Sequence, residues 1–310
     1  MSLPDALRAR LSLPVIGAPM FLVSTPPLVR AQCRAGIIGA FPSLNARTPD
    51  ILDAWLAELG QTLGGRDAPF AVNLIVHRTN PRLEVDLALC VRHRVPIVIT
   101  SLGAQPHVYQ QVAAYGGLVF HDVTTPSYAR KALDKGAPGL VAVAAGAGGH
   151  AGTLSPFALI QEIRAMFGGP LALSGAIATG GSILAAQAIG ADLAYVGSAF
   201  IASEEAEASA DYKVMVAASH AEDILYTSRF TGVPGNYLRP SIVAAGIDPA
   251  TLSASDEVRL DMTSLGHDKK AWRDIWGCGQ GIGAVDAVLP AADLVCRWRS
   301  EYASAKAALT

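Results

Sequence analysis

The stretch LALSGAIATGGSILAAQAIGADLAYVGSAF, residues 171–200, contains the pattern that decides the fold. A short apolar run at 171–177 leads through a glycine-rich turn into a segment with apolar residues at helical spacing. A second apolar run follows at 193–200. Continuous apolar runs are typical of strands that are buried on both faces. The stretch therefore predicts one β-α-β unit of a parallel sheet.

The same unit is repeated along the chain. Apolar runs of strand length occur at 15–20, 37–43, 70–76, 97–101, 118–123, 139–145, 171–177 and 193–200. Several of the helical segments between them open on Thr-Pro or Ser-Pro, and several close on glycine, at Gly36, Gly60, Gly116, Gly136 and Gly190. Eight units predict an α/β protein with a (β/α)8 TIM barrel. An open doubly wound sheet is the alternative, but no G-x-G-x-x-G motif follows the first strand.

The pattern changes after about residue 205. The segment ADYKVMVAAS (210–219) can serve as the last barrel helix, and the tail 291–309 also has a helical pattern. We expect residues 1–210 to form the barrel. We expect residues 211–310 to form a partly helical C-terminal lobe packed over the catalytic face.

Composition and charge exclude several classes of protein. The chain has 310 residues, 51% of them hydrophobic and 16% charged, with a net charge of −2 and a pI of about 6.4. This charge favours neither nucleic acid nor an anionic membrane surface as a partner. No apolar run approaches the ~20 residues that cross a bilayer, and the start, MSLPDALRAR, lacks the apolar core of a signal peptide. Four scattered cysteines without a C-x-x-C pair indicate a reducing compartment and no zinc site, and no other metal-ligand spacing occurs. We therefore expect a soluble, cytoplasmic protein.

Candidate site residues lie where the predicted strands end, because barrel enzymes place their chemistry at the carboxyl ends of the strands. These positions include Ala18, Met20, Asn73, Ser101, His121, Gly148, Ser174, Gly175, Ala176, Gly197 and Ser198. His121 and Asp122 are neighbours in one strand and point to opposite faces, so only one of them is expected to enter the barrel mouth.

Two features of these strand ends have a functional and a structural interpretation. The glycines and serines after the last two strands, followed by Thr179, Gly180 and Gly181, can form an anion site at a helix N-terminus, or they can simply permit tight turns. Asn73 interrupts the apolar run FAVNLIV (70–76). Its amide can pair with the edge of a heterocycle such as a flavin, or it can satisfy backbone groups in the core.

The stretch VAAGAGGHAG (143–152) ends in His150 after a series of residues with small side chains or none. Small residues let a flat ligand approach the backbone closely. A histidine beside such a surface is well placed for acid–base chemistry near neutral pH. The alternative is a histidine that hydrogen-bonds a neighbouring loop.

Several motifs in order resemble the nitronate monooxygenase family, formerly called 2-nitropropane dioxygenases. They are GAPM, FAVNL, AGAGGHAG, LSGAIATG and YVGSAF, between residues 13 and 203, and the later segment IWGCGQGIGAV (275–285). The superfamily includes FMN-dependent enoyl-ACP reductases and NADH:quinone reductases. Some members carry lysine where this chain has Asp122.

The resemblance implies a barrel that binds FMN at its mouth. Ala18, Met20 and Gly148 would lie near the flavin ring, and Asn73 would bind its pyrimidine edge. Ser101, His121 and Ser174 are further candidate contacts. Gly175, Ala176, Gly197 and Ser198 would hold the phosphate, with Gln280 of the flavin-proximal segment 275–285 nearby. His150 matches the catalytic histidine of the family.

The implied reaction oxidises alkyl nitronates, and in some cases nitroalkanes, with O2 to carbonyl compounds and nitrite. An NAD(P)H-dependent enoyl thioester or quinone reductase on the same scaffold is the first alternative. A flavin-binding sensor without turnover is the second. Use of NAD(P)H, the physiological nitronate and the oligomeric state are left open, with a homodimer as one option.

Overall fold

Eight parallel strands form a closed barrel in the computed structural model, which describes residues 3–252 and 274–309. In chain order they are β1 (Val15–Gly17), β2 (Gly39–Pro42), β3 (Phe70–Ile75), β4 (Ile97–Ser101), β5 (Leu118–Val123), β6 (Leu140–Val143), β8 (Leu171–Ser174) and β9 (Leu193–Val196). The sheet order is β1-β9-β8-β6-β5-β4-β3-β2. The ends of this order also meet, because Gly17 N–H donates to the Ile38 carbonyl at 2.7 Å and Ile38 N–H donates to the Val15 carbonyl at 3.0 Å. The predicted TIM barrel is thereby confirmed, and the open sheet is excluded.

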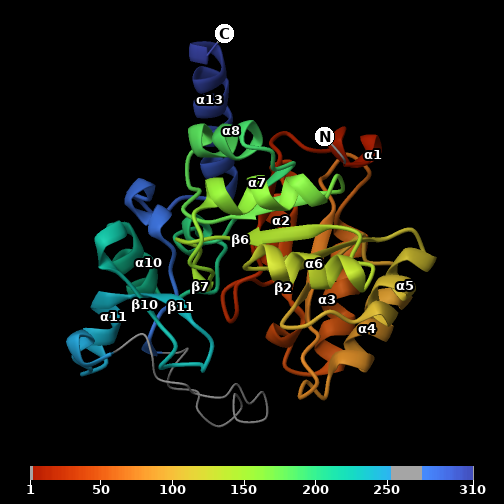
Figure 1. Cartoon of the computed structure of the whole chain (residues 1–310), viewed down its shortest axis with the longest axis horizontal. Coiled ribbons are helices and arrows are strands. Elements are labelled where there is room, and N and C mark those ends of the chain that lie inside the picture. The colour runs from red at the N-terminus through yellow and green to blue at the C-terminus, as the bar shows by residue number, and fades with distance from the viewer. Residues whose placement is uncertain (1–2, 253–273, 310) are drawn as a thin grey trace.

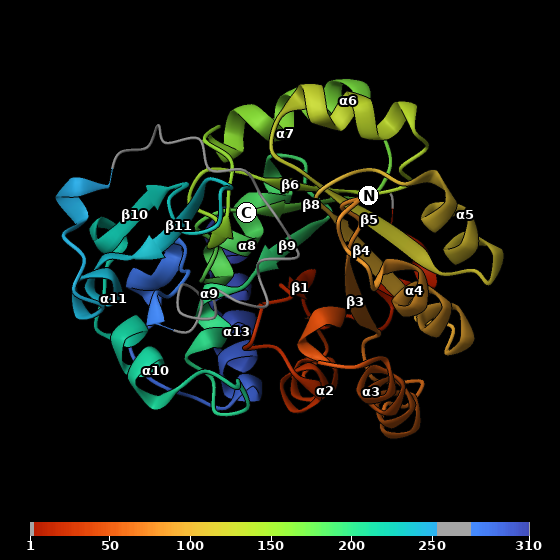
Figure 2. The ribbon, with the colours of Figure 1, turned by 90° about the horizontal axis from the view of Figure 1, so that it is seen from below.

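Helices follow the strands and surround the barrel (Figure 2). They are α2 (Pro26–Arg34), α3 (Pro49–Thr62), α4 (Leu83–Arg92), α5 (Pro106–Ala114), α6 (Pro126–Asp134), α7 (Pro156–Met166) and α8 (Gly180–Ala188), with the short α1 (Asp5–Arg8) before β1. Four of them begin at a proline that follows Thr or Ser, as the sequence predicts, but only Thr48 and Thr125 accept a capping hydrogen bond. The glycine endings are confirmed except at Gly60, which lies inside α3.

Two apolar layers hold the barrel together. Inward-facing residues such as Ile16, Ile99, Phe120 and Leu193 fill its interior. The alternate residues of each strand pack outward against the helices in a second and larger cluster. Because both faces of every strand are buried, the strands read as continuous apolar runs in the sequence.

The chain after the barrel strands contains a small sheet that the sequence did not predict. Strands β10 (Ile224–Thr227) and β11 (Gly235–Leu238) pair antiparallel, and β11 also pairs with β7 (Gly149–His150) from the segment after β6. Helices α10 (Ala210–Ala217) and α11 (Arg239–Ala244) complete this region (Figure 1), together with α9 (Ser198–Ile201) and short 3-10 turns. The lobe is therefore a mixed structure, and the β7–β11 pairing joins it to the loop that carries His150.

The last helix, α13 (Ala291–Leu309), completes the ring of barrel helices. It packs between α8 and α2, which is the place of the eighth barrel helix (Figure 2). Trp298 is fully buried there and its ring meets the edge of Phe200 at 5.2 Å between centroids. The expectation that residues 210–219 fill this place is wrong. Those residues form α10, which packs against α9 and the 3-10 turn Gln280–Ala284.

No helix in the described ranges is long and apolar enough to cross a membrane. Within the same ranges, no group of three or more His, Cys, Asp or Glu side chains could hold a metal ion.

Candidate active site

A cavity lies where the carboxyl ends of β6, β8 and β9 meet the C-terminal segment. It is lined by Gly146, Ala147, Gly148, Ser174, Gly175, Ala176, Ile177, Tyr195, Gly197, Ser198, Gly279 and Gly281. Six of the predicted site residues are among them. Ten of the twelve lining residues are glycine, alanine or serine, so the backbone itself forms most of the wall.

The glycines after β6 permit a close approach between two segments of the chain. A Cβ atom at Gly148 would lie 2.9 Å from the backbone nitrogen of Gly279, and a Cβ at Gly279 would lie 2.5 Å from the Gly146 carbonyl oxygen. The contact is fixed by Gln280 N–H, which donates to the Gly146 carbonyl at 2.9 Å, and by Gly279 N–H, which donates to Ser198 Oγ at 2.8 Å. Part of the glycine pattern is thus explained by chain packing. The segment 275–285 reaches the cavity, as the sequence predicts.

The turn after β8 has an unusual backbone. Gly175 has φ +140° and Ala176 has φ +52°, a left-handed conformation that a residue with a Cβ rarely adopts. A left-handed alanine is unfavourable, so its occurrence indicates a local demand on the backbone. Ala176 N–H donates to the Gly146 carbonyl at 3.2 Å, which ties this turn to the loop after β6.

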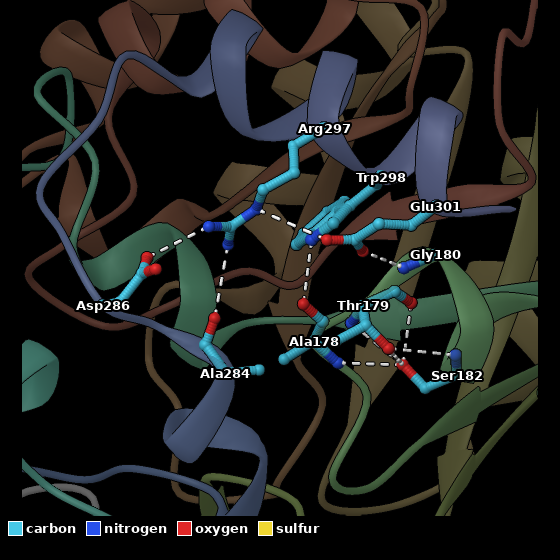
Figure 3. Close-up of polar contacts among 9 residues, drawn as sticks. All are labelled: Ala178, Thr179, Gly180, Ser182, Ala284, Asp286, Arg297, Trp298 and Glu301. Atoms are coloured by element: carbon cyan, nitrogen blue, oxygen red, sulfur yellow. Dashed lines mark hydrogen bonds and ion pairs between the residues drawn. The ribbon is translucent and has the colours of Figure 1, made fainter. Parts of the chain in front are cut away.

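The N-terminus of α8 is capped by the protein itself, as Figure 3 shows. Gly180 N–H donates to Glu301 Oε2 of α13 at 2.7 Å, and the N–H groups of Ala178 and Thr179 both donate to Ser182 Oγ. A carboxylate already occupies the position in which an external anion would meet the helix dipole. The anion site considered for Thr179–Gly181 is therefore filled by Glu301. The cavity wall uses other positions: Gly175 and Ala176 lie before the α8 cap, and Gly197 and Ser198 lie at the start of α9.

His150 is positioned by the small sheet. It lies in β7 opposite Gly235 of β11, and its Nε2 is 3.1 Å from Thr231 Oγ1. The Thr231 hydroxyl also lies 3.1 Å from the Val233 carbonyl oxygen and 3.3 Å from the Tyr237 hydroxyl, so the imidazole belongs to a small polar cluster. Burial lowers the pKa of His150 to about 4. The imidazole is consequently neutral near pH 7 and can accept a proton.

A chain of polar side chains crosses the ends of β3, β4 and β5. Asn73 Nδ2 donates to Ser101 Oγ at 2.8 Å and to the Ile99 carbonyl at 3.1 Å. Ser101 Oγ donates to Asp122 Oδ2 at 2.5 Å. Both amide hydrogens of Asn73 are thereby engaged, which leaves Oδ1 as the atom with which this side chain can bind a ligand.

His121 is the predicted site residue that the structure does not bring to the others. Its side chain is buried on the outer side of the barrel, where Nδ1 lies 2.8 Å from Thr100 Oγ1 and the ring meets Tyr109 of α5 edge-on at 6.2 Å. Burial lowers the pKa of His121 to about 4, with the nearby Lys135 charge adding to the effect. Asp122, the next residue, is the one that enters the barrel mouth.

Ala18 and Met20 lie beside β9. A Cβ atom at Gly197 would lie 3.3 Å from Ala18 Cβ and 3.6 Å from Met20 Sδ. Asn45 Nδ2 donates to the Met20 carbonyl at 3.0 Å and so holds this loop. Gln280 stands between the lining residues Gly279 and Gly281, with Oε1 near Gly146.

Sequence reasoning missed Tyr195 and Thr231. Tyr195 lies within an apolar run and lines the cavity. Thr231 is 81 positions from the histidine that it contacts. Tyr195 is two residues after Leu193 in the same strand, so alternation could have suggested that both side chains face the barrel interior. No local signal in the sequence connects Thr231 to His150.

The family model described as nitronate monooxygenase matches residues 7–298. A nitronate monooxygenase of Paraburkholderia phytofirmans is 26% identical, covering 93% of this chain and 92% of its own length. One of Pseudomonas aeruginosa is 28% identical, covering 71% of this chain and 74% of its own length.

Solved structures are similar over almost the whole chain. The nitroalkane oxidase of Streptomyces ansochromogenes superposes with a TM-score of 0.83 at 27% identity, covering 99% of this chain and 100% of that one. FabK from Thermotoga maritima superposes with a TM-score of 0.81 at 24% identity, covering 98% and 96%. The second similarity shows the shared fold.

Proposed function

The chain belongs to the nitronate monooxygenase family and is a flavin-dependent oxidoreductase, and from this premise we propose that it uses FMN and O2 to oxidise alkyl nitronates to carbonyl compounds and nitrite. The observation that carries the proposal is the position of His150. His150 comes two positions after Gly148, which lines the cavity, and its neutral imidazole is held by β7 and Thr231.

The residues present fit FMN. The wall consists mainly of glycine, alanine and serine, which would let a flat ring approach the backbone closely. The Gly197–Ser198 pair carries backbone N–H groups and a hydroxyl of the kind that a phosphate needs, and Gly175 lines the same cavity. Asn73 Oδ1 can accept from the N–H of a flavin pyrimidine edge. When bound, FMN would supply the electron transfer that amino-acid side chains cannot.

The role of the protein is to bind the substrate and control a proton. A nitronate carries negative charge on its nitro oxygens, and His150 would orient that group by donating the N–H of its imidazole. With a neutral nitroalkane, His150 would take the α-proton on its unprotonated ring nitrogen, because the imidazole is neutral near pH 7.

Oxygen uptake by purified protein loaded with FMN, with propyl-2-nitronate as substrate and with and without NADH, tests the proposal. We expect uptake and nitrite formation without NADH, and neither in flavin-free protein. Anaerobic NADH that bleaches the flavin rapidly, with no nitronate-dependent uptake, would instead establish the reductase alternative. Yellow protein that turns over no nitronate, quinone or enoyl thioester would favour a sensor.

A further inference from the structure

Asp122 places a carboxyl group inside the mouth of the barrel. Along β5, Phe120 faces the barrel interior and His121 faces the helices, so the alternation of the strand turns Asp122 inward. Asp122 Oδ2 accepts from Ser101 Oγ at 2.5 Å. Its other oxygen, Oδ1, is buried and has no hydrogen-bond partner in the described part of the chain.

The surroundings of Asp122 are neutral. Ser101 faces it from β4, Asn73 stands behind that serine on β3, and Val141 lies beside it on β6. From β9, Tyr195 is within electrostatic reach, since burial and then the Asp122 charge raise the pKa of this phenol. No lysine or arginine of ranges 3–252 and 274–309 forms an ion pair with Asp122.

A buried carboxyl oxygen without a partner is costly, because water has been lost and nothing replaces it. Such an atom indicates either a neutral acid or a ligand that supplies the missing hydrogen bond. Tyr195 lines the proposed flavin cavity, and Asn73 belongs to the same polar chain as Asp122. Because Tyr195 is within electrostatic reach of Asp122, the carboxyl lies on the side of the barrel mouth that borders this cavity.

We propose that Asp122 controls the reduction potential of the bound flavin by presenting Oδ1 to the pyrimidine side of the ring. This rests on the proposed FMN site. As a neutral acid, Asp122 can donate a hydrogen bond to a ring acceptor. As a carboxylate, it places a negative charge beside a ring that gains negative charge on reduction, and so disfavours the reduced flavin.

Burial raises the pKa of Asp122 to about 7, against the smaller lowering effect of the Ser101 hydrogen bond. The acid is therefore mainly neutral below this pH and ionised above it. We expect the midpoint potential of the bound flavin to fall as pH rises through this range. The fall should be larger than that of free FMN.

The test measures midpoint potentials of bound and free FMN, from which the ratio of the dissociation constants of reduced and oxidised FMN follows. Between about pH 6 and about pH 9 this ratio should rise roughly tenfold more in the wild type than in Asp122→Asn, since one pKa unit of interaction is a factor of ten. The asparagine keeps the shape and can still accept from Ser101, but it does not ionise.

Two further variants separate this effect from structural damage. Ser101→Ala removes the hydrogen bond that lowers the pKa of Asp122, so the inflection should move to higher pH. Asp86→Asn removes another buried carboxyl with an unpartnered oxygen, on α4 outside the barrel, and should leave the potential unchanged.

Equal pH dependence in the wild type and Asp122→Asn would overturn the role of Asp122, even if nitronate is oxidised. Protein that binds FMN and shows the extra pH dependence, but oxidises no nitronate, would contradict the proposed function alone. Protein that binds no FMN after reconstitution would overturn both.

Discussion

His150 combines a fixed position with a neutral ring. The β7–β11 pairing and Thr231 hold the imidazole, and burial lowers its pKa to about 4. A general base works only while it is unprotonated, so His150 stays competent down to about pH 4 and loses its function below that value. At the ordinary pKa of 6.5, half of the imidazole would already be protonated at mildly acidic pH.

The variant His150→Asn should keep the fold and FMN. We expect activity on neutral nitroalkanes to fall roughly 10²–10⁴-fold, the usual contribution of general acid–base catalysis. Activity on preformed nitronates should fall less, because they have already lost the α-proton. Rates on both substrate forms, at equal flavin content and across pH, check this. Equal losses on both forms would remove proton abstraction from the proposed mechanism.

The variant Asn73→Ala should bind FMN more weakly. Loss of a buried hydrogen bond to the ring costs about 1 kcal/mol or more. Titration of the apoprotein with FMN measures the affinity, and thermal unfolding of the apoprotein serves as the control. A variant that loses thermal stability but binds FMN as tightly as the wild type would show that Asn73 serves only Ile99 and Ser101.

At this scale, sequence reasoning found Asn73 because a polar residue in a buried run needs a reason. Sequence reasoning could not decide whether His121 or Asp122 enters the barrel mouth. Alternation says that adjacent strand residues face opposite ways, but it does not say which of them faces inward. That choice depends on the register of β5 with its neighbours.

At the level of elements, the contact of α13 with α8 depends on Gly180. A Cβ at this position would overlap with the Trp298 carbonyl oxygen and the Tyr302 backbone nitrogen. In an ordinary helix, Gly→Ala gains up to about 1 kcal/mol. Here we expect Gly180→Ala to destabilise the protein by roughly 2 kcal/mol or more, because rigid backbone must move.

Gly181→Ala is the matched control. A Cβ at Gly181 would make only ordinary contacts, 3.9 Å from Thr179 Oγ1 and 4.0 Å from Ala305 Cβ. We expect this variant to be neutral or slightly more stable. Denaturant unfolding measures the free energy of unfolding of both variants. An equal change in this free energy for the two substitutions would argue against close packing of α13 on Gly180.

The β-α units could be predicted because each strand is buried on both faces and most helices have local start and stop signals. The strands β7 and β11 could not. β7 has only two residues, one of them glycine, and its partner lies 85 residues further along the chain. The eighth barrel helix was also misplaced, because α10 and α13 both have helical patterns and only packing against α8 distinguishes them.

For the whole molecule, three buried groups couple stability to pH. His121 and His150 have pKa values of about 4, below the ordinary 6.5, so between these values the unfolded chain binds protons that the folded chain does not. Each histidine therefore stabilises the fold fully above pH 6.5 and loses this contribution as pH falls toward 4. Asp122 acts in the opposite direction, because its pKa of about 7 exceeds the ordinary 3.8 and the folded chain holds its proton.

Two protons taken up on unfolding and one released leave a net uptake of one between pH 4 and 6.5. The free energy of unfolding of the apoprotein should then fall by about 1.4 kcal/mol per pH unit on acidification through this range. In Asp122→Asn the opposing contribution is absent, so the fall should be about twice as steep. Urea unfolding of both proteins at several pH values between 4.5 and 6.5 measures the two slopes. Equal slopes would mean that Asp122 titrates at its ordinary pKa in the folded barrel. A wild type whose stability rises on acidification would mean that both histidines titrate near their ordinary pKa in the folded barrel.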